Sequence, residues 1–422
     1  MGEKYINLSE YCLHFRDFIL YYTLLQLLFG GIMTRTYQEI NEKIASGKAV
    51  VVDADEIISI VESEGYEKAL ETVDVVTTAT FSPMCSSGAF INFGHAETPI
   101  RMEKIFLNNV ECNGGLAAVD TFIGATQESI DKGMEYGGAH VICDLIDGKD
   151  IHLYATAKGT DCYPRKEIST YININDINEA YLYNPRNCYQ NYSAATNSSS
   201  KRLYTYMGVL QPNFGNVTYA TAGQLSPLLN DPYLRTIGLG TRIFLAGTQG
   251  YVTWQGTQYN SAQKRGENGV PLGGGATLAV TGNMKEMSTD FIRPAVFEKY
   301  GTSMSVGIGI PIPVLDMEML KYLCVKDEDI KQTICDYSIR DGRDDAVAQV
   351  TYAQLRSGSV EINGKTVKTA PLTSRYKSKE IATLLKEQIQ KKEFFLTEPV
   401  HMFPQNNSLN GLAIREKKGG NK

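Results

Sequence analysis

The chain has 422 residues, of which 43% are hydrophobic and 21% charged, and it contains 38 glycines. This composition excludes disordered, collagen-like and coiled-coil chains and predicts a globular protein with a large core. The formal net charge of −6 argues against nonspecific binding to nucleic acid or to an anionic membrane. Eight cysteines without a C-x-x-C pair argue against a disulfide framework and against a zinc ribbon.

The most hydrophobic stretch runs from Phe18 to Phe29 and is too short to cross a bilayer, which takes about 20 apolar residues. No signal-peptidase cleavage pattern follows it. We therefore expect residues 1–32 to be an extension outside the catalytic fold, no membrane segment, and a cytoplasmic protein whose fold begins near Met33.

The first part of the chain predicts alternating helices and strands. Helical spacing after Met33 leads into a buried strand, and residues 55–73 predict a helix broken near Gly65, followed by a strand over 73–81. Residues 128–136 predict a helix, and residues 139–146 and 149–157 predict two strands. This pattern is typical of an α/β protein.

The middle of the chain, residues 171–259, holds eleven tyrosines among asparagine, serine and glycine, and predicts loops and short strands. Tyrosines of this kind staple loops over a core or line a polar ligand site. Further on we expect helices over 317–323 and 327–336, a hairpin at Asn363-Gly364, a helix from Ser378 and a polar tail over 405–422. The expected fold is a mixed sheet with helices and a Gly/Tyr-rich irregular middle, forming one elaborated unit or two packed lobes over 33–404.

Three glycine motifs do not complete a nucleotide site. Gly238-Leu-Gly240 lacks the third glycine of a dinucleotide fingerprint, and Gly364-Lys-Thr lacks the spacing of a phosphate-binding loop. The run Gly273–Gly275 reads as a turn or as a nest of backbone amides for an anion. The glycine-rich region nevertheless leaves a flavin- or nucleotide-binding oxidoreductase open as an alternative function.

Two cysteines follow predicted strands. Cys85 lies in TFSPMCSSG, where a proline-bearing turn presents a side chain and free backbone amides. Cys162 lies in AKGTDCYPRK, where Arg165 and nearby lysines favour the thiolate and Asp161 opposes it. Two thiols at strand ends suggest one shared site at a sheet edge. Cys143 and Cys324 lie in apolar runs and are expected in the core.

Several long strings carry a resemblance: TATFSPMCSSGAFINFGH at 78–95, GTDCYPRKE at 159–167, NPRNCYQNY at 184–192 and VGIGIPIPVL at 306–315. Over roughly residues 33–404 the chain resembles the homocysteine-biosynthesis sulfur-incorporation family, which comprises the L-aspartate-semialdehyde sulfurtransferases. Many members carry a pair of nucleotide-sensing CBS modules after this body. This chain stops soon after Pro404, so regulation by adenylates within the chain is not expected.

The resemblance implies insertion of sulfide sulfur into L-aspartate 4-semialdehyde, with two-electron reduction to homocysteine. The family cysteines match Cys85 and Cys162, and we expect Cys85 to carry sulfur as a persulfide and Cys162 to resolve it, or the reverse. No tightly bound cofactor is expected. The sulfur source would be sulfide or a persulfide donor, and reducing power would come from a small ferredoxin-type iron-sulfur protein. A noncatalytic persulfide carrier or sulfide sensor is a further alternative.

The substrate needs binding and proton-transfer groups. Arg186 and Arg242 are candidates for its carboxylate, because a guanidinium binds a carboxylate with two parallel hydrogen bonds. The candidate proton-transfer groups lie beside the thiols in the sequence and are His95, Asp161 and Tyr163.

Overall fold

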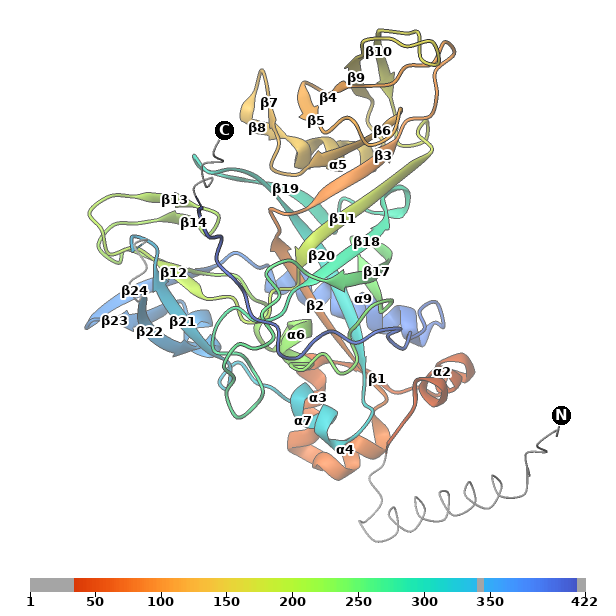
Figure 1. Cartoon of the computed structure of the whole chain (residues 1–422). Helices are drawn as coiled ribbons and strands as arrows, with labels where there is room; N and C mark the ends of the chain where they lie inside the picture. The colour runs from red at the N-terminus through yellow and green to blue at the C-terminus, as the bar shows by residue number, and fades with distance from the viewer. Residues whose placement is uncertain (1–33, 340–344, 416–422) are drawn as a thin grey trace, which may run out of the picture.

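The computed structural model describes residues 34–339 and 345–415, and within these ranges the strands form four sheets (Figure 1). A ten-stranded sheet occupies the centre, with β1 and β2 parallel and the other neighbours antiparallel. The prediction of a mixed sheet in an α/β fold is confirmed. Its strands in order are β1 (Val51–Asp53), β2 (Val75–Pro83), β20 (Gly301–Pro313), β16 (Arg242–Leu245), β17 (Thr248–Gln255), β18 (Leu278–Asn283), β11 (Glu179–Asn187), β3 (Gly88–Asn92) and β6 (Asp120–Gly124), with β19 (Ile292–Phe297) paired to β20.

Helix α9 (Arg375–Gln390) packs on β2 and β20, with Ile381 and Leu385 fully buried. Two glycines of β20 allow this close approach. A Cβ at Gly307 would lie 2.7 Å from Ile381, and one at Gly309 would lie 3.2 Å from Leu385. The glycines of the VGIGIPIP string therefore seat α9 on the sheet, and α2 (Tyr37–Ser46) joins the same cluster of buried residues.

Helices α3 (Ala54–Glu64), α4 (Tyr66–Thr72) and α7 (Met317–Leu323) share a second core cluster, which includes Val76 of β2 and Ile312 of β20. Asp53 caps α3 through its side chain and Glu56 closes a capping box. The predicted break at Gly65 separates α3 from α4, so the two-part helix over 55–73 is confirmed.

Two predictions for the region of the second sheet are wrong. Residues 139–146 form α5 (Gly138–Ile146) rather than a strand, because a short, wholly apolar run fits a buried helix as well as a buried strand. Residues 128–136 form a hairpin rather than a helix. The sheet order is β10 (Glu167–Ile172), β9 (Ile151–Thr156), β4 (Lys104–Leu107), β5 (Val110–Cys112), β7 (Glu128–Ser129) and β8 (Gly133–Gly137).

The third sheet collects short strands from the tyrosine-rich middle and from the last part of the chain. Residues 331–336 are a strand with alternating burial, so the helix expected over 327–336 is wrong, whereas the hairpin at Asn363-Gly364 is confirmed. A separate hairpin joins β13 (Leu203–Thr205) to β14 (Gly208–Leu210). The sheet order is β22 (Ala346–Thr351), β21 (Lys331–Asp336), β12 (Ala194–Thr196), β15 (Val217–Tyr219), β24 (Lys365–Pro371) and β23 (Ser359–Ile362). Short helices α6 (Pro227–Asn230) and α8 (Tyr352–Arg356) flank these strands.

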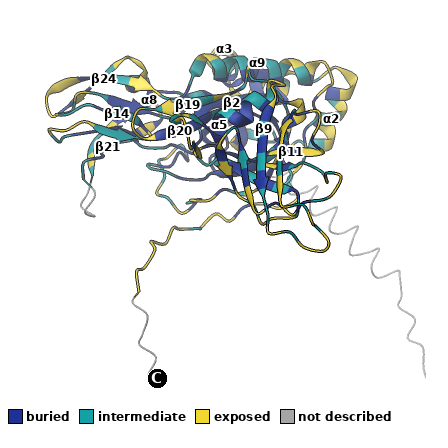
Figure 2. Cartoon of the chain, turned by 90° about the horizontal axis from the view of Figure 1, so that it is seen from above, coloured by how far each residue is buried: buried dark blue, intermediate teal, exposed yellow. Residues whose placement is uncertain are grey.

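Figure 2 shows buried residues concentrated where β2 and β20 pass through the centre, with exposed residues on the outer faces of α2 and α9. The segment after α9 packs back onto the body: Phe403 is buried, and Ser261 donates to the carbonyl of Pro404 at 2.6 Å. In the part of the chain that the structure describes, no helix is long and apolar enough to cross a membrane. The extension predicted over residues 1–32 lies outside the described residues.

Candidate active site

Cys85 lies in a tight turn directly after β2. The backbone N–H of Ser87 donates to the carbonyl of Met84 at 3.1 Å, which places Cys85 and Ser86 at the two central positions. The N–H of Met84 donates to Met304 of β20 at 2.7 Å and ties the turn to the sheet. The thiol is half-buried, and its position in a turn after a strand confirms the prediction from the sequence.

A buried asparagine of β11 holds this turn. The side-chain nitrogen of Asn184 donates to the hydroxyl of Ser87 at 2.7 Å, and its oxygen accepts from the hydroxyl of Ser86 at 2.9 Å. The same oxygen accepts from the backbone N–H of Arg186 at 2.8 Å. Asn184 has no exposed surface. One side chain therefore fixes both the Cys85 turn and the backbone of Arg186.

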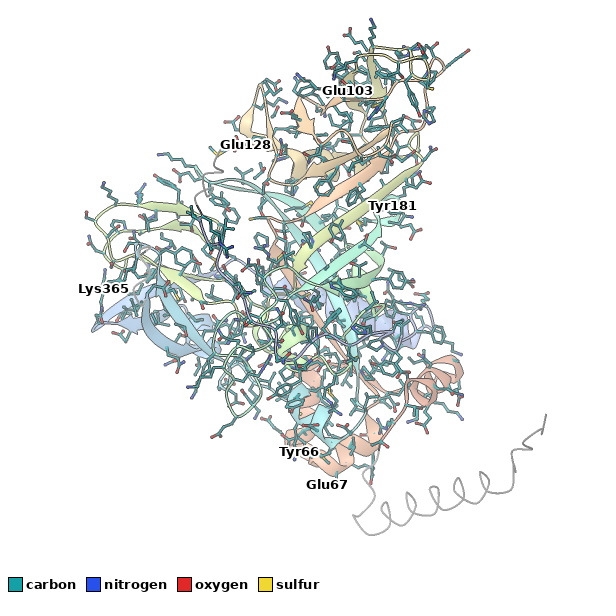
Figure 3. The ribbon with its side chains drawn as sticks, viewed as in Figure 1. Tyr66, Glu67, Glu103, Glu128, Tyr181 and Lys365 are labelled. Atoms are coloured by element: carbon teal, nitrogen blue, oxygen red, sulfur yellow. The ribbon has the colours of Figure 1, made fainter. Side chains whose placement is uncertain are left out.

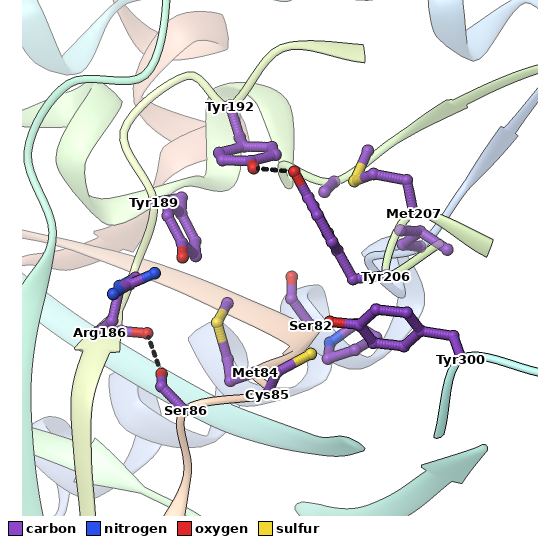
Figure 4. Close-up of a pocket in the computed structure, with 13 residues that line it drawn as sticks. Ser82, Met84, Cys85, Ser86, Arg186, Tyr189, Tyr192, Tyr206, Met207 and Tyr300 are labelled. Atoms are coloured by element: carbon purple, nitrogen blue, oxygen red, sulfur yellow. Dashed lines mark hydrogen bonds between the residues drawn. The ribbon is translucent and has the colours of Figure 1, made fainter. Parts of the chain in front are cut away.

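Cys85 and Arg186 line the same cavity, whose volume is about 290 Å³, near the lower end for small-molecule sites. The cavity lies between the central sheet, which contributes the Cys85 turn, and the third sheet, from which Ala220 and Leu372 follow β15 and β24. Two hairpin turns border it with aromatic side chains, Tyr206 between β13 and β14 and Tyr300 after β19 (Figure 4).

Tyr300 lies beside Cys85, and the two side chains point toward each other in the cavity (Figure 4). Burial, together with the neighbouring Cys85, raises the pKa of Tyr300 to about 12. Its hydroxyl therefore keeps its proton at neutral pH and can donate to a charged sulfur atom.

The backbone of the turn offers further donors. Among the described residues, no acceptor pairs with the N–H groups of Cys85 and Ser86. Successive free amides in a turn form an anion-binding cradle, and donors of this kind stabilise a developing oxyanion. The Cys85 turn can therefore present a nucleophile and two oxyanion donors to one bound molecule.

Arg186 is the one charged side chain among the described residues that line the cavity. Its Nε donates to the hydroxyl of Thr257 at 3.0 Å, and Tyr189 lines the same cavity. Thr257 orients the guanidinium from outside the cavity, which suits it to bind a carboxylate beside Cys85.

Cys162 lies elsewhere, in the loop between β9 and β10 of the second sheet, and it is exposed. It is absent from the lining of the Cys85 cavity, and Figure 1 places the β9–β10 hairpin far from the β13–β14 hairpin. The expectation of one shared sheet edge is wrong, because β2 and β9 belong to different sheets. The sequence could not reveal this, since both cysteines follow strands in the same way.

The residues around Cys162 join two loops. Arg165 donates to the backbone carbonyls of Glu97 and Thr98 at 2.8 and 2.9 Å, and His95 stacks on Tyr163 with ring centroids 6.0 Å apart. The three sequence candidates His95, Asp161 and Tyr163 thus lie with Cys162 and are not among the residues that line the Cys85 cavity.

Arg242 also lies outside that lining. Its backbone N–H donates to Thr397 at 2.7 Å, and its guanidinium lies over the ring of Phe394, 5.9 Å from the ring centroid. The structure therefore separates the two arginine candidates and leaves Arg186 with Cys85.

The remaining described cysteines are mostly core residues. Cys112, Cys143, Cys188 and Cys324 are buried, which confirms the expectation for Cys143 and Cys324. Burial raises the pKa of Cys112, Cys143 and Cys324 to about 12. Among the described residues, no three His, Cys, Asp or Glu side chains are grouped to hold a metal ion.

Two of the glycine motifs, at 238–240 and 364–366, lie away from the Cys85 cavity. Leu239, between Gly238 and Gly240, pairs with His401 in an isolated bridge. Gly364 lies in the turn between β23 and β24. Neither segment contributes to the Cys85 cavity.

Sequence reasoning did not single out Asn184 or the tyrosines that border the cavity. Asn184 stands two residues before Arg186 in the NPRN string, and the density of tyrosines over 171–259 was the available signal for Tyr189, Tyr192 and Tyr206. Tyr300 lies outside that range and reaches the site only because β19 and β20 form a hairpin.

Comparison with known proteins identifies the family of this chain. Residues 49–396 match the family described as "Homocysteine biosynthesis enzyme, sulfur-incorporation", and the chain belongs to that family. It is 49% identical over 381 residues to a protein of Methanosarcina acetivorans named L-aspartate semialdehyde sulfurtransferase, covering 90% of this chain and 74% of that protein. A protein of the same name from Methanocaldococcus jannaschii is 50% identical over 384 residues, covering 87% of this chain and 73% of that protein.

A more distant relative, an uncharacterized protein of Methanothermobacter thermautotrophicus, is 27% identical over 344 residues, which cover 78% of this chain and 74% of that protein. No solved structure matches the chain significantly.

Proposed function

We propose that this chain is an L-aspartate semialdehyde sulfurtransferase that converts L-aspartate 4-semialdehyde to L-homocysteine. The support is its identity of about one half, over about nine tenths of its length, to two proteins of that name. The observation that carries the assignment to a site is the presence of the Cys85 thiol and the Arg186 guanidinium in one small cavity. The substrate offers an aldehyde to the first group and a carboxylate to the second.

The overall chemistry balances with an external reductant. One aldehyde and one hydrogen sulfide give a thiocarbonyl and one water, and two electrons with two protons reduce the C=S bond to the thiol. A small ferredoxin-type iron-sulfur protein is the electron donor that we propose. The reduced thiols that this reaction needs fit a cytoplasmic location.

Cys85 is the proposed sulfur carrier. A persulfide donor would pass its outer sulfur to the Cys85 thiolate and leave as a thiol. The terminal sulfur of the Cys85 persulfide would then add to the aldehyde carbon, forming the new C–S bond, while the amides of Cys85 and Ser86 stabilise the oxygen anion. Tyr300 would donate a proton at this stage, because its side chain points toward Cys85 in the cavity and keeps its proton at neutral pH. Cleaving the S–S bond of this adduct takes two electrons beyond the two that reduce the C=S bond, and sulfide alone forms no persulfide because its sulfur is already fully reduced.

Cys162 is the proposed resolving thiol. Its exposure makes it accessible to an external reductant. Its attack on the S–S bond of the Cys85–substrate adduct would release the substrate with its new sulfur and leave a Cys85–Cys162 disulfide for the external donor to reduce, which requires the 157–166 loop and the Cys85 turn to approach each other. The carrier and resolving roles are therefore assigned to separate places in the fold.

The experiment is homocysteine formation by the purified full chain from L-aspartate semialdehyde, a sulfur source (a persulfide donor, and sulfide in a parallel reaction) and a chemical reductant, followed by mass spectrometry. We expect steady product formation that is lost in Cys85→Ser and retained in Cys335→Ser, a second half-buried cysteine outside the cavity. Product formation undiminished in Cys85→Ser would contradict the assigned site. A persulfide on Cys85 without any homocysteine would support a noncatalytic carrier instead.

A further inference from the structure

We propose that Tyr189, Tyr192, Tyr206 and Tyr300 form an aromatic cage that binds the α-ammonium group of the substrate. This inference rests on the proposed function, because it takes an amino acid with a free ammonium group as the ligand. The cage would recognise the α-ammonium group of the substrate, which neither Cys85 nor Arg186 binds.

The four rings follow one another around the cavity (Figure 4). The ring centroids are 4.7 Å apart for Tyr189 and Tyr192, 6.3 Å for Tyr192 and Tyr206, and 6.0 Å for Tyr206 and Tyr300. The interplanar angles are 64°, 67° and 63° in the same order. In each pair the edge of one ring meets the face of the next, so the four rings form a continuous aromatic border of the cavity.

Three separate chain segments supply the wall. Tyr189 and Tyr192 follow β11, Tyr206 stands in the β13–β14 turn and Tyr300 in the β19–β20 turn. The hydroxyl of Tyr206 is 2.8 Å from that of Tyr192 and 3.0 Å from that of Tyr337. These bonds hold Tyr192 and Tyr206 in place through their hydroxyl groups, and the side chains of all four tyrosines border the cavity.

The charges of the cavity favour a cation bound by rings. Among the described residues that line it there is no Asp or Glu, and Arg186 carries the one formal charge. An amino acid whose carboxylate binds Arg186 therefore meets no carboxylate partner for its ammonium group. The negative face of an aromatic ring attracts such a cation, and several rings together form the cages that bind alkylammonium groups.

The tyrosines act as neutral rings rather than as phenolates. Burial raises the pKa of Tyr189, and burial with the neighbouring Tyr206 raises that of Tyr192. Burial and Cys85 raise the pKa of Tyr300 to about 12. The cage therefore attracts a cation through the rings, and this attraction does not change with pH near neutrality.

The test uses two unreactive ligands that differ only in the ammonium group, L-homoserine and 4-hydroxybutyrate, with binding to the full chain measured by calorimetry. We expect the wild-type chain to bind L-homoserine more tightly. Tyr206→Leu, at a turn where the side chain is 36% exposed, should weaken L-homoserine binding by about 10- to 30-fold and leave 4-hydroxybutyrate unchanged. Tyr206→Phe keeps the ring and should retain the preference.

Tyr181→Leu is the matched control, because Tyr181 is an exposed tyrosine on β11 outside the cavity (Figure 3). Equal loss of both ligands in Tyr206→Leu, no preference in the wild type, or binding of neither ligand would overturn the cage. Homocysteine formation is measured separately on the same preparation. Product without an ammonium preference contradicts the cage alone, and a preference without product contradicts the proposed function alone.

Discussion

The side-chain nitrogen of Asn184 donates a hydrogen bond to the hydroxyl of Ser87, at an N–O distance of 2.7 Å. Through this contact a fully buried residue of β11 fixes the turn that carries Cys85, which follows β2 about a hundred residues earlier in the chain. Asn184 is thus a positioning residue: it does not itself line the cavity, and it acts through its hydrogen bonds to Ser86, Ser87 and Arg186.

Replacing Asn184 by Ala should lower kcat/KM by about 10- to 100-fold, because small displacements of reacting groups are costly. It should also lower the free energy of unfolding by about 1–3 kcal/mol, because buried partners lose their hydrogen bonds. The rate of Cys85 alkylation by iodoacetamide reports the placement of the thiol directly. Asn41→Ala is the control, since Asn41 makes two hydrogen bonds to Leu396 away from the site. Equal alkylation and turnover in both variants would contradict the positioning role.

Variants of Cys85 and Cys162 should stop the reaction at different stages. Cys85→Ser should take up no sulfur and form no product, whereas Cys162→Ser should still accept sulfur on Cys85 but stop after about one turnover. Peptide mass mapping after treatment with a persulfide donor checks this. Sulfur on Cys162 with an unmodified Cys85 would reverse the assigned roles.

Variants of the two arginine candidates should differ in their KM for the semialdehyde. Arg186→Met should raise KM for the semialdehyde by about 10- to 100-fold. The variant loses the charge-assisted hydrogen bonds to the carboxylate, which contribute about 1.5–3 kcal/mol to binding. Arg242→Met serves as the comparison, since its guanidinium lies over Phe394 and outside the cavity lining. A larger rise in KM for Arg242→Met than for Arg186→Met would show that the carboxylate binds elsewhere.

The buried thiols should make the fold less stable at alkaline pH. Burial raises the pKa of Cys112, Cys143 and Cys324 to about 12, against about 8.5 in an unfolded chain. Their contribution is complete below the unfolded value and is lost as pH rises toward the folded value, because only the unfolded state releases the protons. Each thiol should therefore remove about 1.4 kcal/mol per pH unit between about pH 9 and 11. Urea unfolding at several pH values measures this slope, and Cys143→Ala should reduce it. An unchanged slope in that variant would refute the linkage.

The close packing of α9 on β20 should not tolerate a methyl group at Gly307. A Cβ there would lie 2.7 Å from Ile381, so Gly307→Ala should lower the free energy of unfolding by about 1–3 kcal/mol. Urea denaturation checks the value. Gly274→Ala is the matched control, since a Cβ at Gly274 meets no atom within 4 Å. A loss of the same size in both variants would mean that the methyl group at Gly307 is accommodated.

Local sequence determined the elements whose signals are short-range. The break at Gly65, the hairpin at Asn363-Gly364, the helix over 317–323 and the turn that exposes Cys85 all follow from residues within a few positions of one another. The long strings around Cys85 and Cys162 also indicated the family, which the match over residues 49–396 confirms.

Tertiary structure decided what depends on long-range pairing. The apolar run 139–146 satisfies a buried helix and a buried strand equally, and packing made it a helix. Cys85 and Cys162 carry the same local signal, but β2 pairs into the central sheet and β9 into another, which separates the thiols. Tyr300, Arg186 and Tyr206 meet at Cys85 because hairpins and strands distant in sequence converge there, a geometry that no local pattern encodes.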